Sequence, residues 1–75
     1  MISRERNYPA LVKEVRKQLS LSQEDLAREL GVSYTTINRW ENRQSKPSKM
    51  AKALFDRFCE KMTEQGSLRL PESLR

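Results

Sequence analysis

The segment Leu21–Asn42 reads LSQEDLARELGVSYTTINRWEN and is the most informative part of the chain about its fold. Apolar residues recur at helical spacing up to Leu30, and Ser22 before them is a residue type that caps helix N-termini. Gly31 follows directly, where a glycine in the left-handed conformation commonly ends a helix. The pattern therefore predicts a helix over residues 23–30.

A second helix is predicted immediately afterwards, from Tyr34 to Asn42, with Ser33 as its cap. Ile37 and Trp40 are three residues apart, so they share the face that packs on the preceding helix. Two helices separated by about three residues, with a glycine between them, have the helix-turn-helix layout. The outward face of the second helix then carries only polar or basic side chains and one tyrosine: Tyr34, Thr35, Thr36, Asn38, Arg39 and Asn42.

These outward residue types are the ones that read DNA. Arginine pairs with guanine, asparagine with adenine, and threonine or tyrosine contacts phosphate or a thymine methyl. Between Ser33 and Lys52 five basic residues stand against one acid, a local net charge of +4 within a chain whose net charge is +5. A charge run is usually a solvated surface, but its position around one polar helix favours a phosphate footprint. Two alternatives stay open: Arg39 paired with an acid, and Tyr34 packed on the loop at Pro47.

The remainder of the chain reads as helix and loop. A first helix is predicted to begin at Tyr8-Pro9, with Leu11, Val12, Val15 and Leu19 on its inner face. After a polar loop over 43–47, Pro47 or Ser48 opens a longer helix over 50–65 that ends at Gly66. Its apolar stripe is expected to be chiefly core and comprises Met50, Leu54, Phe55, Phe58 and Met62.

We therefore predict one all-α domain over residues 1–75, a compact four-helix fold with a fifth helix as the alternative. Its core spans about 8–65, with an N-terminal arm at 1–7 and a C-terminal tail at 67–75. A four-helix core does not need all of these apolar side chains. The surplus consists of the last members of the stripe together with Leu68, Leu70 and Leu74. We expect them to form a subunit interface.

Composition excludes several classes of protein. The chain has no histidine and one cysteine, Cys59, so neither an internal disulfide nor a zinc site is expected, and Cys59 reads as a packing residue. No apolar run approaches the ~20 residues of a membrane span, and the N-terminus does not resemble a signal peptide. No catalytic constellation is present. We expect a cytoplasmic protein that is not an enzyme and uses no metal or cofactor.

The segment Leu11–Pro47 resembles the Cro and phage-repressor (XRE) type of helix-turn-helix protein. The resemblance is carried by an ordered set of residues: Ser-Gln, Leu-Ala, Leu-Gly-Val-Ser, an isoleucine, Trp-Glu-Asn and Lys-Pro. It implies a sequence-specific regulator of transcription, a repressor that binds double-stranded DNA as a homodimer. Each subunit would place one helix in the major groove of an inverted-repeat operator. Relatives often carry a fifth helix that contributes to the core and to the dimer contact.

The resemblance also assigns roles to individual residues. It links Arg16 of the first helix to Glu41 at the end of the third as a structural pair. The base-contacting positions that it implies are Tyr34, Thr35, Asn38 and Arg39. The phosphate-contacting positions are Gln23, Thr36, Asn42, Arg43 and Lys46. An antitoxin-like module, whose C-terminal apolar stripe binds another protein, is the alternative function.

Overall fold

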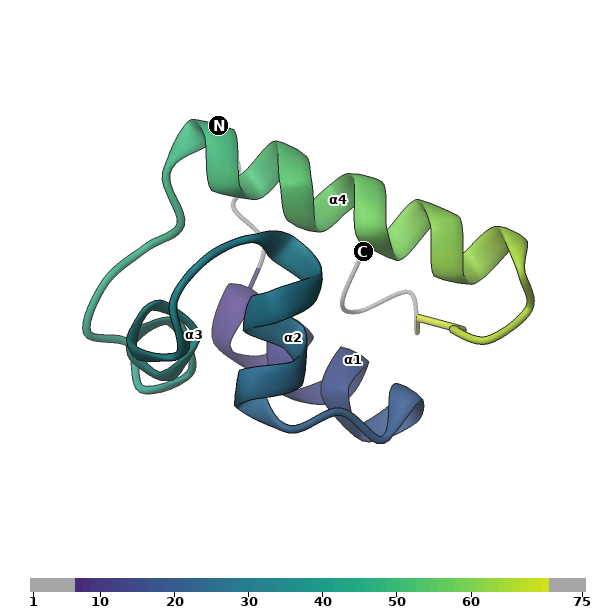
Figure 1. Ribbon diagram of the computed structural model, residues 1–75, viewed down its shortest axis with the longest axis horizontal. Helices are drawn as coiled ribbons and strands as arrows, with labels where there is room; N and C mark the ends of the chain where they lie inside the picture. The colour runs from purple at the N-terminus through teal and green to yellow at the C-terminus, as the bar shows by residue number, and fades with distance from the viewer. Residues whose placement is uncertain (1–6, 71–75) are drawn as a thin grey trace, which may run out of the picture.

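The computed structural model describes residues 7–70, which form four α-helices joined by short connections (Figure 1). The helices are α1 (Tyr8–Leu19), α2 (Gln23–Leu30), α3 (Tyr34–Glu41) and α4 (Lys49–Glu64). No strand occurs within residues 7–70, and no fifth helix follows α4 there, so the predicted all-α, four-helix fold is confirmed. The predicted arm, except for Asn7, and the predicted tail from residue 71 onward lie outside the described residues.

Serine side chains cap three of these helices. Ser22, Ser33 and Ser48 each accept a hydrogen bond, at 3.0–3.1 Å, from the backbone N–H three residues further along. In α2 the contact is reciprocal, because the backbone N–H of Ser22 donates to the Asp25 carboxylate at 3.0 Å and completes a capping box. The caps predicted at Ser22 and Ser33 are confirmed, and Ser48 rather than Pro47 caps α4.

Left-handed residues end the helices. Gly31 has φ +74° and follows α2, as predicted, and its N–H donates to the carbonyl of Ala27. Gly66, with φ +78°, follows the last turn of α4. The third helix ends at Glu41, one residue before the predicted end, and Asn42 is its C-cap.

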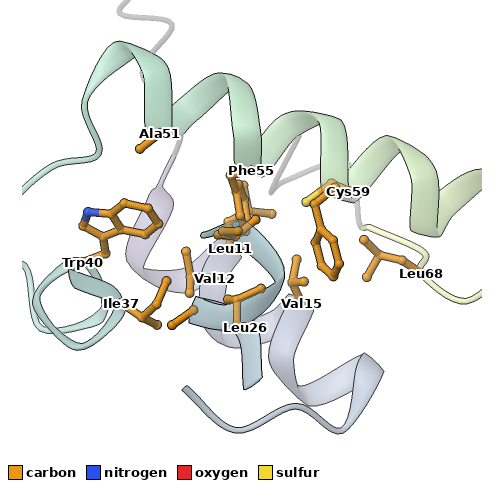
Figure 2. Packing of buried hydrophobic residues seen from close by; sticks show 13 residues of the cluster. Leu11, Val12, Val15, Leu26, Ile37, Trp40, Ala51, Phe55, Cys59 and Leu68 are labelled. Atoms are coloured by element: carbon orange, nitrogen blue, oxygen red, sulfur yellow. The ribbon is translucent and has the colours of Figure 1, made fainter. Parts of the chain in front are cut away.

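The core lies where α1, α2 and α3 meet α4 (Figures 1 and 2). Helix α2 packs against α3 and α4, and α1 packs against α3. In Figure 2 Phe55 of α4 points down onto Leu11, while Ile37 and Trp40 approach from α3. The side chains with no exposed surface are Leu11, Val12, Val15, Leu26, Ile37 and Phe55.

Helix α4 buries the predicted stripe only in part: Phe55 and Phe58 are buried and Met62 packs against the core, as predicted. Its buried residues are Ala51, Phe55, Phe58 and Cys59, which recur at helical spacing. Met50 and Leu54 precede Ala51 and Phe55 by one residue each, which turns them about 100° away from the core. Met50 is 75% exposed and Leu54 37%, so the prediction that both are core residues was wrong.

The segment after α4 returns to the core. The backbone N–H groups of Ser67 and Leu68 both donate to the carbonyl of Met62, which turns the chain back sharply. Leu68 is 3% exposed and Leu70 packs against the same cluster. The expectation that Leu68 serves a subunit interface was therefore wrong, because its side chain completes the core of its own chain. Leu74 lies outside the described residues.

Candidate nucleic-acid interface

The solvent-facing side of α3 carries the four predicted base-contacting residues. Tyr34, Thr35 and Arg39 are exposed, and Asn38 is partly buried at the edge of α2. Ile37 and Trp40 fix the opposite side of the helix in the core, as their spacing predicts. The arrangement presents a polar helix surface on a rigid support, which is the geometry that major-groove readout requires.

Asn38 is held by its neighbours on both sides of its amide. Its Nδ2 donates to Oε1 of Gln23 at 3.2 Å, and its Oδ1 accepts from Nδ2 of Asn42 at 3.2 Å. Asn42 Nδ2 also lies 3.0 Å from the backbone carbonyl of Asn38. A primary amide has two N–H donors and two acceptor lone pairs. One N–H donor and one lone pair of Asn38 therefore remain available to a DNA base. The network fixes the direction in which those remaining groups point.

Gln23, at the start of α2, hydrogen-bonds to both Asn38 and Glu41 of α3. While it accepts from Asn38, its Nε2 donates to Oε1 of Glu41 at 3.0 Å. Gln23 thereby links the solvent-facing side of α3 to a buried carboxylate. These two hydrogen bonds brace α3 against the start of α2.

A partly buried ion pair joins α1 to the end of α3, with the Arg16 side chain 24% exposed and that of Glu41 4%. Arg16 Nε lies 2.6 Å from Glu41 Oε2 and Arg16 Nη2 lies 2.8 Å from Glu41 Oε1, a bidentate pairing. Nη1 of the same guanidinium donates to the carbonyl of Leu21 at 3.2 Å. The pair implied by the resemblance is thus present. It ties the loop before α2, the end of α3 and α1 into one rigid unit.

The environment of Glu41 determines its ionisation. Burial alone would raise the pKa of this carboxyl group, but hydrogen bonds from Arg16 and Gln23, together with the positive charge of Arg16, outweigh burial. The pKa of Glu41 is therefore lowered. The hydrogen bond with Glu41 correspondingly raises the pKa of Arg16. The pair is ionised at neutral pH.

The loop that follows α3 supplies the predicted phosphate-contacting cations. Arg43 and Lys46 are exposed, whereas Pro47 is buried and anchors the loop. Arg43 adopts φ +61°, an uncommon conformation for a residue with a side chain. Figure 1 shows this loop at the same end of the molecule as α3. Thr36, the other predicted phosphate contact on α3, is half-buried and shares a 2.9 Å hydrogen bond with the Ser33 hydroxyl.

Sequence reasoning counted Lys52 in the basic cluster but did not place Tyr8 beside it or beside this loop. The ammonium group of Lys52 on α4 lies 5.8 Å from the centre of the Tyr8 ring at the start of α1. Both residues line one cavity together with Arg43 and Lys46. No sequence signal connects Tyr8 with Lys52, because the two residues are far apart in the chain and only packing places them together.

Residues 7–70 offer neither a metal site nor a membrane-spanning helix. No group of three or more histidine, cysteine, aspartate or glutamate side chains is placed there to hold a metal ion. None of the helices described combines the length and apolar character that crossing a membrane requires.

Comparison with known proteins identifies the family. A helix-turn-helix family model matches residues 12–54, more than half of the chain and the segment that contains α2, α3 and the basic loop. No curated protein and no solved structure matches the chain. The matched family is one of DNA-binding domains and not of enzymes. The chain belongs to the helix-turn-helix family of the Cro and phage-repressor (XRE) type, and it is a DNA-binding regulator of that type.

Proposed function

We propose that this protein is a transcriptional repressor that binds an inverted-repeat operator as a homodimer, with one copy of α3 in each major-groove half-site. The observation that carries the proposal is the polar, solvent-facing side of α3 beside a loop that bears Arg43 and Lys46. A protein seated in the groove across a promoter blocks access of the transcription machinery, which is repression. Because it acts on DNA, we place it in the cytoplasm.

The proposed base contacts come from four residues of α3. Arg39 is exposed and offers a bidentate pair of donors to O6 and N7 of guanine. Asn38 offers its remaining donor and acceptor to adenine. Tyr34 and Thr35, in the first turn, face the groove floor or a thymine methyl. Contacts to bases discriminate between base pairs, whereas contacts to phosphate fix the position of the protein along the duplex.

The proposed phosphate contacts flank α3 on two sides. On one side Gln23 begins α2, whose first backbone N–H groups and positive dipole end favour an anion. On the other side Asn42, Arg43 and Lys46 follow the end of α3. Thr36 reaches the backbone between them. The two groups would hold the sugar-phosphate strands on either side of the major groove.

The exposed apolar residues of α4 support the homodimer. Met50 and Leu54 are four residues apart and therefore adjacent on the helix surface, and neither is used by the core of its own chain. We propose that a second copy covers this surface, with the whole chain acting as one domain. The alternative, an antitoxin-like module, would place another protein on the same two residues.

Selection of bound sequences from a random duplex pool tests the proposal. We expect enrichment of an inverted repeat whose half-site centres lie about 10 base pairs apart or a multiple of that distance. An enriched motif without symmetry would contradict the homodimer but not the recognition by α3. Failure to enrich any sequence would contradict sequence-specific binding itself.

A further inference from the structure

Four side chains form one continuous chain of hydrogen bonds from the buried end of α3 to its solvent-facing side. The chain runs from Glu41 through Gln23 and Asn38 to Asn42, with donor–acceptor distances of 3.0, 3.2 and 3.2 Å. In each link the residue farther from Glu41 supplies the N–H and the nearer residue supplies the oxygen. We infer that Glu41 is a positioning residue for base recognition, because its carboxylate sets the direction of these hydrogen bonds and thereby the donor and acceptor that Asn38 presents to DNA. The inference rests on the proposed function and gives Glu41 a role in specificity beyond its ion pair with Arg16.

The direction of the chain starts at the carboxylate. An ionised carboxylate only accepts hydrogen bonds, whereas a primary amide presents either its oxygen or its NH2 group to a neighbour. Glu41 accepts two hydrogen bonds from Arg16, at 2.6 and 2.8 Å, and this pairing favours the charged carboxylate. Gln23 can therefore meet Glu41 only with its NH2 group, which leaves the Gln23 oxygen toward Asn38.

Gln23 passes the direction on to Asn38. Because the Gln23 oxygen only accepts, Asn38 donates to it through Nδ2 and turns its own Oδ1 toward Asn42. The far end of the chain agrees, since Asn42 Nδ2 also donates to the backbone carbonyl of Asn38, another group that only accepts. The remaining N–H and lone pair of Asn38 thus have fixed positions on α3. A bidentate contact with N6 and N7 of adenine requires such a fixed donor and acceptor.

Burial makes this order costly to disturb. The Glu41 side chain is only 4% exposed, and Gln23 and Asn38 are both half-buried, so water has little access to replace a lost partner. In Glu41→Gln one carboxylate oxygen becomes an NH2 group, which faces a donor of Arg16 in either orientation of the new amide. Turning the Gln23 amide round then removes one conflict and creates another at Asn38. Asn38 would no longer present a single pattern of donor and acceptor.

The test measures base preference one position at a time. Affinities for operators that carry each of the four base pairs at every position of the half-site give these preferences. Asn38→Ala and Arg39→Ala then identify the positions that depend on Asn38 and on Arg39. At the Asn38 position the wild type should prefer one base pair by about fivefold or more. Glu41→Gln should lose this preference and keep the preference at the Arg39 position, whereas a displaced α3 would lower both.

Arg16→Lys separates the direction of the hydrogen bonds from the ion pair. The substitution removes the bidentate pairing but keeps a positive charge beside Glu41, whose carboxylate still only accepts. Arg16→Lys should lower the thermal midpoint and keep both base preferences. Glu41→Gln should lower the thermal midpoint as well, so loss of the Asn38 preference in Glu41→Gln alone is an effect of polarity. All affinities are measured below the lowest thermal midpoint of the set.

A second variant decides the matter if Glu41→Gln does not fold. Gln23→Leu leaves the ion pair intact and interrupts the chain with a side chain that neither donates nor accepts. It should lose the Asn38 preference and keep that at the Arg39 position. In the free wild type, the side-chain NH2 protons of Gln23 should exchange with water several times more slowly than those of exposed Gln44. Arg16→Lys should retain this protection, because the acceptor of the hydrogen bond is unchanged.

The outcomes separate the inference from the proposed function. Equal losses at the two positions in Glu41→Gln, or no loss at either, overturn the inference. Loss of the Asn38 preference in Arg16→Lys, its retention in Gln23→Leu, or unprotected Gln23 protons in the wild type also overturn it. In each of these cases sequence-selective binding by the wild type leaves the proposed function standing. If the wild type prefers no sequence, the proposed function fails and the inference fails with it.

Discussion

Gln18 and Arg69 exchange two hydrogen bonds although 51 residues separate them in the sequence. The Gln18 amide nitrogen donates to the carbonyl of Arg69 at 2.7 Å, and the Arg69 N–H donates to the Gln18 amide oxygen at 2.8 Å. One side chain thus satisfies both backbone groups of a residue, as a neighbouring strand would. The contact holds the segment after α4 against α1, with Leu68 in the core. This segment closes the core beyond the end of α4.

Leu68→Ala should destabilise the protein by about 2–5 kcal/mol, the usual cost of truncating a buried leucine. Met50→Ala is the matched control, because it shortens an apolar side chain that is 75% exposed, and it should change the free energy of unfolding by no more than about 0.5 kcal/mol. Urea unfolding followed by circular dichroism measures both. Equal effects of the two variants would contradict the role of the C-terminal segment in the core.

Arg39→Ala should relax the choice of sequence. The loss of one bidentate base contact costs about 1–3 kcal/mol on the operator and little on random duplex, so the ratio of the two affinities falls. Lys46→Ala should weaken both duplexes alike. Arg28→Ala serves as the control, because Arg28 is an exposed arginine of α2 that pairs with Asp25 at 2.7 Å. An equal loss on operator and random duplex for Arg39→Ala would count against base reading.

Gln23 and Asn38 should act as a coupled pair in DNA binding. Gln23 accepts a hydrogen bond from Asn38, so removing either side chain releases the other. A double-mutant cycle of Gln23→Ala and Asn38→Ala on operator affinity should give a coupling energy of about 0.5–3 kcal/mol. The same cycle with Thr35→Ala in place of Asn38→Ala provides the comparison. Strict additivity of the first cycle would mean that Gln23 contacts DNA without orienting Asn38.

The ion pair between Arg16 and Glu41 should make stability fall at acid pH. The folded pKa of Glu41 is below its usual value of 4.5, so the unfolded chain binds the proton first as the pH falls. The contribution is fully present above about pH 5 and is lost as the pH falls through the folded pKa.

Glu41→Gln isolates this contribution. At pH 7 the variant should be less stable on the order of 3 kcal/mol, because the Arg16 guanidinium loses its carboxylate partner in a largely buried site. The difference from the wild type should shrink toward pH 3. Free energies of unfolding in urea at several pH values test this. A constant difference across that range would contradict the assigned ionisation.

Met50→Lys should weaken self-association without unfolding the chain. The side chain is largely exposed, so a charge there is harmless to the monomer but unfavourable in an apolar interface. Sedimentation equilibrium at micromolar concentration, with and without operator DNA, compares the variant with the wild type. A second variant, Lys61→Gln, controls for charge on α4. A wild type that stays monomeric on DNA would disprove the proposed dimer.

Much of the fold follows from local rules and was predictable from the sequence. The caps at Ser22 and Ser33, the end of α2 at Gly31 and the inward face formed by Ile37 and Trp40 all agree with the structure. Each depends on a residue and its neighbours within about one turn of helix, where backbone donors and side-chain spacing are fixed. The polar character of the exposed α3 face follows from the same spacing.

The buried face of α4 was less predictable, for a physical reason. Its apolar residues spread over about 140° of the helix circumference, because Met50 and Leu54 stand beside Ala51, Phe55 and Phe58. Periodicity alone does not tell which of two adjacent stripes the partner helices cover. Contact with α2 and with the side chain of Tyr8 sets the orientation of α4. In this orientation the face of α4 that contains Phe55 is buried.

Local sequence accounts for the two central helices, the turn at Gly31 and the polar surface of α3, because these depend on interactions between residues close in the chain. Helix packing, by contrast, places Leu68 in the core, brings Gln23 between Asn38 and Glu41, and sets Lys52 over Tyr8 beside the basic loop. The reason is that each of these contacts joins segments distant in sequence. Their proximity depends on how whole helices pack, and the spacing of residues along the chain does not predict it.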